Sequence, residues 1–189
     1  TGAEIVGNTI ILHLVDGKRG DDDLEANGRI TDPGGPAAIG PQARLSFPYL
    51  VSTAEEKTEI GIINAENYAS TFTISYYSET GVLIRAVTTT LRPQGQAVIP
   101  SHSIPPDSAS AIVTGDGHAV GYTRYANSRG KRCAWSADTR TQKSLPVPHT
   151  AIDRNWATAL VLFNPTDEAM GVTLTFESGA TGSFTLNAR

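Results

Sequence analysis

The stretch Thr71-Phe72-Thr73-Ile74-Ser75-Tyr76 alternates hydroxyl and apolar side chains with a period of two. Successive side chains of a β-strand point to opposite faces, so Phe72, Ile74 and Tyr76 share one face and the hydroxyl residues share the other. The pattern therefore predicts a strand with one face in a core and the other face in solvent.

Similar runs, rich in Thr, Val, Ile and Tyr, recur along the chain and are separated by turn residues such as Pro93-Gln94-Gly95 and Gly115-Asp116-Gly117. The one helix-like stretch, 52–59, starts with a capping-box pattern but is too short for more than a turn or two. Short strands at this spacing predict a sandwich or a barrel. The further predicted strands are 9–15, 59–63, 82–91, 96–99, 109–114, 119–125, 131–137, 158–163, 172–176 and 183–186.

An internal repeat is the most informative long-range feature. Residues 47–76 align with residues 147–176 at a constant offset of 100, and the core positions match in kind, as Ile62 matches Leu162. Asn64 and Asn164 both end the first apolar strand, where an Asn side chain can bond to nearby backbone and start a turn. We therefore expect an all-β fold, an antiparallel β-sandwich built from two related β-units.

The domain organisation follows from the length of the second copy. It reaches only about three strands before Arg189, too few to be stable alone, so we expect residues 41–189 to form one sandwich domain. The competing arrangement is a complete domain with a loosely attached half-copy. Residues 1–40 combine a strand with an acidic, Gly/Pro-rich run, which is typical of the tail of a preceding domain followed by a linker.

Composition excludes several classes of protein. The net charge of −4 gives no field that would attract nucleic acid, and the longest apolar run, at 159–163, is too short for direct membrane insertion. A single cysteine, Cys133, excludes an intrachain disulfide, and we interpret it as a small buried apolar residue.

The acidic segment carries a resemblance. Its groups Gly20-Asp21-Asp22-Asp23, Asn27-Gly28 and Asp32-Pro33-Gly34-Gly35-Pro36-Ala37 resemble a stretch found near the end of repeat-bearing bacterial surface proteins. The remainder, including Gly121-Tyr122-Thr123-Arg124-Tyr125, looks like the β-rich repeats of bacterial secreted and surface proteins. The resemblance implies an extracellular or cell-surface setting, with other domains of the same protein as partners, and it transfers no catalytic residues.

The same segment is the best candidate for a metal site. A hard cation such as Ca²⁺ needs six to eight oxygen ligands on a tight loop, and this run is the densest group of such ligands. Three consecutive aspartates do not match the EF-hand spacing, so a solvated acidic linker is the alternative. No other cofactor is expected. The candidate ligands are Asp16, Asp21, Asp22, Asp23, Asn27 and Asp32.

No motif indicates catalysis. A Gly-x-Ser-x-Gly turn is absent, and the four histidines lack metal-binding spacing, so each is interpreted as a loop or strand-end residue. The chain is therefore not expected to be an enzyme. The histidines are His13, His102, His118 and His149.

Two aromatic features leave alternatives open. The stretch 122–135 combines four basic residues with three aromatics, which could grip an anionic ligand or could be a basic hairpin with aromatics in the core. Tyr49, Tyr68 and Trp156 could form a platform for sugars. We expect a non-catalytic structural or adhesion module, with a protein or glycan ligand, and a carbohydrate-binding β-sandwich module is the alternative.

Overall fold

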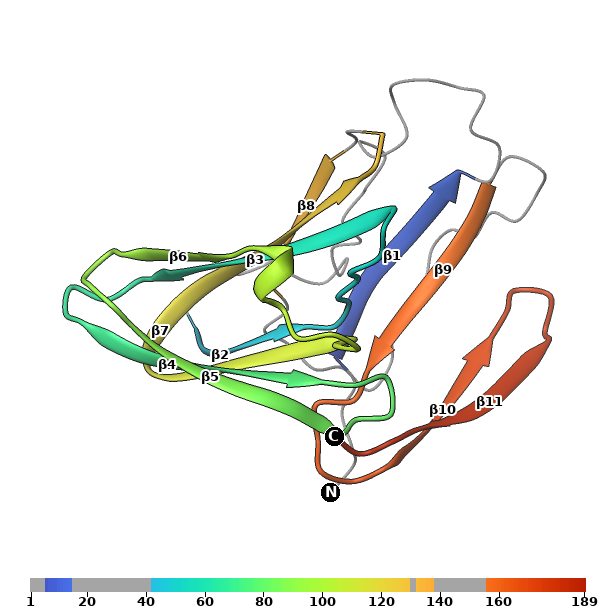
Figure 1. The fold of residues 1–189 in the computed structure, drawn as a ribbon. Helices are drawn as coiled ribbons and strands as arrows, with labels where there is room; N and C mark the ends of the chain where they lie inside the picture. The colour runs from blue at the N-terminus through green and yellow to red at the C-terminus, as the bar shows by residue number, and fades with distance from the viewer. Residues whose placement is uncertain (1–5, 15–41, 130–131, 138–155) are drawn as a thin grey trace.

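The computed structural model describes residues 6–14, 42–129, 132–137 and 156–189, which form an antiparallel all-β fold (Figure 1). The predicted fold class is confirmed. These segments contain one short 3-10 turn, η1 (Ser101–Ser103), and no helix long and apolar enough to cross a membrane. The strands are β1 (Val6–Leu14), β2 (Gln42–Phe47), β3 (Glu56–Asn64), β4 (Ser70–Tyr77), β5 (Leu83–Leu91), β6 (Gln96–Ile99), β7 (Ser110–Asn127), β8 (Arg132–Ser136), β9 (Trp156–Phe163), β10 (Met170–Thr175) and β11 (Thr181–Leu186).

Strand β7 organises the seven-stranded sheet because it pairs with four other strands. Its residues 111–114 pair with both β2 and β4, and its residues 122–126 pair with both β3 and β8. Ala119 pairs with Gln42 of β2 and with Asn64 of β3, so β2 and β3 lie on opposite edges of β7. It follows that β3 and β4 share one edge, and that β2 and β8 share the other.

The bend in β7 differs from the prediction. Residues 115–117 were expected to be a turn between two strands, but they lie inside one 18-residue strand. The sheet curls at this point, so that the layer with β4 and β5 faces the layer with β3 and β6 (Figure 1). Glycines let the strand bend there while it continues to pair on both sides of the bend.

The helix-like segment 52–59 does not form a helix. Thr53 accepts hydrogen bonds from the backbone N–H groups of Glu55 and Glu56, at 3.2 and 2.9 Å, in a tight turn that leads into β3. The hydroxyl of Thr58, already in β3, accepts a bond from the backbone N–H of Val51 at 2.9 Å. Pairing with β7 therefore overrides the local helical preference.

The core lies between the two layers of the curled sheet. In β4 buried and half-buried residues alternate, and Phe72, Ile74 and Tyr76 are 1–2% exposed, as the sequence pattern predicts. Burying large apolar side chains in this way supplies most of the favourable free energy of folding. The other buried apolar residues of this core are Leu45, Phe47, Leu50, Ile60, Ile62, Leu91, Ile104, Ala111, Val113, Ala119 and Ala137.

The C-terminal strands form two small sheets, in which β9 pairs with β1 and β10 pairs with β11. Phe163, at the end of β9, packs with Ile112 and Tyr77 on the outer face of the large sheet. Arg44 of β2 donates a hydrogen bond from Nη2 to the carbonyl oxygen of Pro165 at 2.9 Å. The predicted division between residues 1–40 and 41–189 falls outside the described residues and stays a prediction.

Strands β3, β4 and β5 (the first unit) and β9, β10 and β11 (the second unit) match in local detail. Asn64 donates to the carbonyl oxygen four residues on, at 2.8 Å, and Asn164 does the same at 2.7 Å. In the hairpins that follow, the hydroxyl of Thr73 bonds to that of Thr88, and the hydroxyl of Thr173 bonds to that of Ser183. The sheets around the two units differ, so the internal repeat itself stays a prediction.

Candidate functional site

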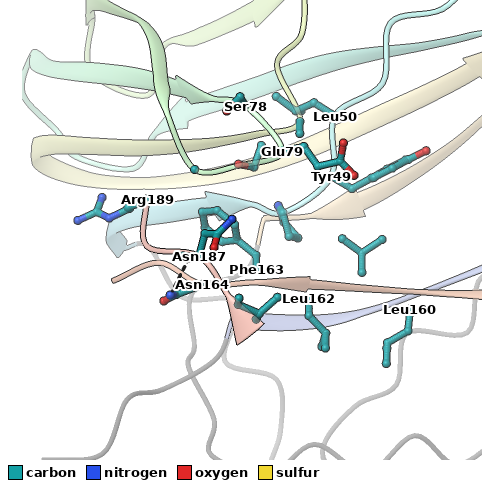
Figure 2. Close-up of a pocket in the computed structure, with 16 residues that line it drawn as sticks. Tyr49, Leu50, Ser78, Glu79, Leu160, Leu162, Phe163, Asn164, Asn187 and Arg189 are labelled. Carbon is teal, nitrogen blue, oxygen red and sulfur yellow. Dashed lines mark hydrogen bonds between the residues drawn. The ribbon is translucent and has the colours of Figure 1, made fainter. Parts of the chain in front are cut away.

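A cleft of about 470 Å³ lies where the second unit meets the rest of the fold (Figure 2). One wall is formed by β9 and the end of β11, with Leu160, Leu162 and Leu186. The opposite wall is formed by Tyr49 and Leu50, which follow β2, and by the turn between β4 and β5. Its volume and largely apolar lining are of the kind that binds small ligands or inserted side chains.

The two leucines of β9 explain why the cleft exists. Leu160 and Leu162 are half-buried, whereas Ile60 and Ile62, at the matching positions of β3, are 0% exposed. In the first unit these positions face a complete core. In the second unit the same kind of side chains line an open space.

Asn164 fixes the polar end of the cleft. Its Nδ2 donates to the carbonyl oxygens of Glu168, at 2.7 Å, and of Asn187, at 2.9 Å, and its Oδ1 accepts from the backbone N–H of Thr166 at 3.0 Å. Figure 2 shows Asn187 next to Asn164, both of them beside Phe163. One side chain thus holds the end of β9, the following turn and the end of β11 together, as the predicted structural role requires.

The apolar surface continues along the hairpin of β10 and β11, and we call it the open face. Met170 and Val172 of β10 are 5% and 7% exposed, whereas Phe184, opposite Val172 on β11, and Phe176, just after β10, are 40% and 49% exposed. A Cβ added at Gly182, which pairs with Leu174 on this face, would meet nothing within 4 Å. Contiguous exposed apolar side chains of this kind mark interaction surfaces in soluble proteins.

Charged groups lie at the margin of the cleft. Burial lowers the pKa of Arg44, and the neighbouring Arg189 lowers it further, but a guanidinium in this position stays charged. Arg189 pairs with Asp167 at 3.1 Å, and its Nε is buried without a hydrogen-bond partner among the described residues. Arg189, which also lines the cleft, therefore carries one buried donor that no described residue satisfies.

The structure describes the surroundings of two histidines, His118 and His102. His118 places Nδ1 2.5 Å from Glu66 Oε1, and its backbone N–H donates to the same oxygen at 3.0 Å. These bonds lower the pKa of the Glu66 carboxyl, the backbone bond most strongly. His102 lies in η1. In the part of the chain that the structure describes, no three His, Cys, Asp or Glu side chains gather as metal ligands would.

Several predicted site residues lie outside the description. The six candidate calcium ligands, Asp16 to Asp32, fall within residues 15–41, and His149 falls within residues 138–155. The calcium site therefore stays a prediction. For Cys133 and His13 only the strands that hold them, β8 and β1, are described.

The basic stretch forms a hairpin of β7 and β8, which is compatible with both interpretations of its sequence. Arg124 pairs with Glu59 across to β3. Tyr125 is 9% exposed and donates its hydroxyl to the carbonyl oxygen of Tyr49 at 2.6 Å. The hydroxyl of Tyr122 accepts a bond from Gln96 Nε2 at 2.8 Å. These side chains therefore hold strands together in the folded protein.

Two of the three rings in the predicted sugar platform are separated. Tyr49 stacks on Tyr125, with ring centroids 5.7 Å apart, next to Thr58 in the early part of β3. Tyr68 is 50% exposed in the turn after Asn64, at the other end of β3. Six residues of strand separate these ends by roughly 20 Å, so these two rings do not form one platform. Carbohydrate binding elsewhere stays a prediction.

No family model matches the chain, and no curated protein matches it. Among solved structures, the chain is similar to the crystal structure of Thermotoga maritima 1070, with 10% sequence identity and a TM-score of 0.45. The match covers 51% of this chain and 93% of that chain.

Sequence reasoning missed the cleft and the open face. The alternation of apolar residues at 170, 172, 174 and 176 is visible in the sequence and predicts an apolar face. Whether other strands cover that face depends on distant segments, which the alternation does not specify. The sequence therefore predicts that this surface is apolar, but it does not predict that the surface is exposed.

Proposed function

We propose that this chain is a non-catalytic structural or adhesion module of a larger bacterial surface or secreted protein, and that it assembles with other proteins through its second unit. The observation that carries the proposal is the contrast between Ile74, 2% exposed in a closed core, and Phe176 and Phe184, 49% and 40% exposed on the open face. An apolar surface that the described residues leave uncovered supports a role in association.

The polar side chains support the same proposal. Asn64, Asn164, Arg124 and Glu66 all have partners that hold strands or turns in place. Structural use of such groups is what a stiff module needs. The surface setting rests on the resemblance of the acidic segment and of the β-rich strands to bacterial surface proteins.

The setting is tested on the native full-length protein in its own cells. Intact cells are treated with a protease, and the protein is followed with an antibody against this chain in the cell, the washed surface and the medium. We expect it to be secreted or to be degraded from outside. A protein found only inside intact cells, protected from protease, would overturn the proposal.

The role of the open face is tested with a matched pair of variants in the same full-length protein. Phe184→Glu places a charge on the open face, whereas Thr185→Glu places one on the polar face of the same strand. We expect the first to reduce adhesion or assembly by about tenfold, which corresponds to the loss of one buried apolar side chain, and the second to have little effect. Equal behaviour of the two variants contradicts an association role for this face.

A further inference from the structure

The backbone of β10 has one edge with which no described strand pairs, and this edge can be assigned residue by residue. Phe176 donates its backbone N–H to the carbonyl oxygen of Ala180 at 2.9 Å, in register with the β10–β11 pairs. Backbone groups of an antiparallel strand point alternately to one neighbour and to the other. Val172 and Leu174 therefore bond to β11, as Phe176 does. Gly171 and Thr173 point their N–H and C=O groups away from β11, where no described strand pairs with them.

The matching edge in the first unit is occupied. The backbone N–H of Thr71 points away from β5 and donates a hydrogen bond to Asp116 Oδ1 of β7 at 2.7 Å. Residues 72–77 of β4 pair antiparallel with residues 110–115 of β7 along this edge. In that pairing Ala111 and Val113 lie opposite the core residues of β4 and are 0% and 1% exposed. Strand β7 thus pairs with the backbone edge of β4 and also contributes buried side chains to the core.

We propose that β10 binds an extended segment of a partner protein as an additional antiparallel β-strand, in the place that β7 occupies beside β4. The inference rests on the proposed function, because it specifies how this module assembles. The partner segment carries small or aliphatic side chains at alternate positions, which cover the open face, and polar side chains between them. Main-chain hydrogen bonds supply the affinity of such an added strand, and the alternate side chains supply its specificity.

The edge of β10 is favoured over that of β11 by the same comparison. Strand β11 corresponds to β5, which ends the order of the large sheet and pairs with β4 alone among the described strands. The outward residues of β11, such as Ser183, therefore correspond to the outer edge of β5, on which no described strand lies. In the first unit the further strand, β7, lies on the edge of β4, and β10 is the strand that corresponds to β4.

The probe is a peptide with the sequence of residues 108–117 of this chain, which includes the β7 segment that pairs with β4. It is titrated into the complete chain, and amide hydrogen exchange is measured by NMR. In the free protein we expect fast exchange at Thr173 and slow exchange at Val172 and Leu174. Bound peptide should slow the exchange of Thr173 by about tenfold or more. The same peptide with Ile112→Pro, which removes an N–H that would face β10, should bind at least about tenfold more weakly.

Two protein variants separate edge pairing from other binding. Thr173→Pro removes an outward N–H of β10, and Ser183→Pro removes the outward N–H directly opposite on β11. Both variants lose the same hydroxyl pair, so they share any effect of that bond on folding. We expect peptide binding to fall about tenfold or more in Thr173→Pro and to be retained in Ser183→Pro.

A second pair tests the face, in case proline disturbs the hairpin. Phe184→Glu should weaken peptide binding, and Thr185→Glu should not, while Val172 and Leu174 keep their slow exchange in both. Binding that leaves Thr173 unprotected, or that Ser183→Pro removes and Thr173→Pro does not, overturns the inference. Protection of Thr173 that rises with protein concentration, without peptide, identifies a second copy as the occupant and likewise overturns it. These outcomes are independent of where the native protein is located.

Discussion

The two units use nearly the same local structure with opposite outcomes for their apolar faces. In the first unit Ile60, Ile62 and Ile74 are at most 2% exposed, because β7 and the opposite layer cover them. In the second unit Leu160 and Leu174 are only half-buried. The difference teaches that alternation and turn chemistry build a hairpin, whereas strands from elsewhere in the chain close its core.

The largest expected effect comes from a matched truncation in the two hairpins. Ile74→Ala removes a buried side chain from the closed core and should lower the free energy of unfolding by about 3–4 kcal/mol. Leu174→Ala, at the matching position, should cost about 1 kcal/mol because its side chain is already partly in water. Urea unfolding followed by circular dichroism measures both. Equal losses would show that the second unit is as closed as the first.

The second comparison removes the two asparagines. Asn64 is 0% exposed and donates to three carbonyl oxygens, those of Tyr68, Leu91 and Arg92, so Asn64→Ala should cost about 3 kcal/mol. Asn164 donates to two carbonyl oxygens, and Asn164→Ala should cost about 2 kcal/mol.

The region of the protein that each asparagine substitution destabilises is a second test. Hydrogen exchange should speed up throughout the large sheet when Asn64 is changed, and mainly in β10 and β11 when Asn164 is changed. Asn64→Asp is the control, because it keeps the acceptor for the Glu66 N–H and loses the donor. If Asn164→Ala speeds exchange equally in β4, the two units do not respond separately.

The third comparison uses the glycines that close the two hairpin turns. Gly81 and Gly179 have φ of +85° and +83°, which costs a residue with a side chain about 1 kcal/mol. Gly179→Ala should cost that amount, because its new Cβ meets nothing within 4 Å. At Gly81 the Cβ would collide with the carbonyl oxygen of Ala188, so Gly81→Ala should cost about 2–3 kcal/mol.

The same collision leads us to expect a local change at the end of the chain. The end of the second unit lies against the β4–β5 turn, so Gly81→Ala should displace residues 187–189 and speed the exchange of the Arg189 N–H, which bonds to the Thr166 carbonyl oxygen at 3.1 Å. An Arg189 amide that exchanges at the same rate in both glycine variants would show that this contact does not hold the second unit in place.

The sequence could predict the hairpins but not their surroundings. The alternation around Ile74 is a local signal, and the strand, its buried face and the Gly81 turn follow from it. By contrast, residues 115–117 have turn chemistry but lie within β7, because pairing on both sides of the bend outweighs the local preference. The exposure of the candidate site could not be predicted for the same reason. Phe176 has the sequence pattern of a core residue, and it is exposed because no strand among the described residues covers it.

The smallest expected effect is a pH dependence that arises from Glu66, at one position of the first unit. Glu66 bonds to His118 of β7, which holds the pKa of its carboxyl below the usual 4.5. Thr166, at the matching position, donates its hydroxyl back to Asn164 Oδ1 at 2.7 Å, so a hydroxyl takes the place of the carboxylate at this position of the second turn. A lowered folded-state pKa stabilises the protein above pH 4.5, and this stabilisation is lost as the pH falls through the lowered value.

Unfolding free energies measured from about pH 6 to about pH 3 should therefore fall less steeply in Glu66→Gln than in the unchanged chain. His118→Asn is the control: it removes the ring bond but keeps the backbone N–H bond, which lowers the pKa most, so most of the slope should remain. A slope abolished by His118→Asn would assign the effect to the imidazole. A slope unchanged in Glu66→Gln would mean that the contact between this turn and β7 contributes nothing that titrates, and that the difference between the two turns is one of packing alone.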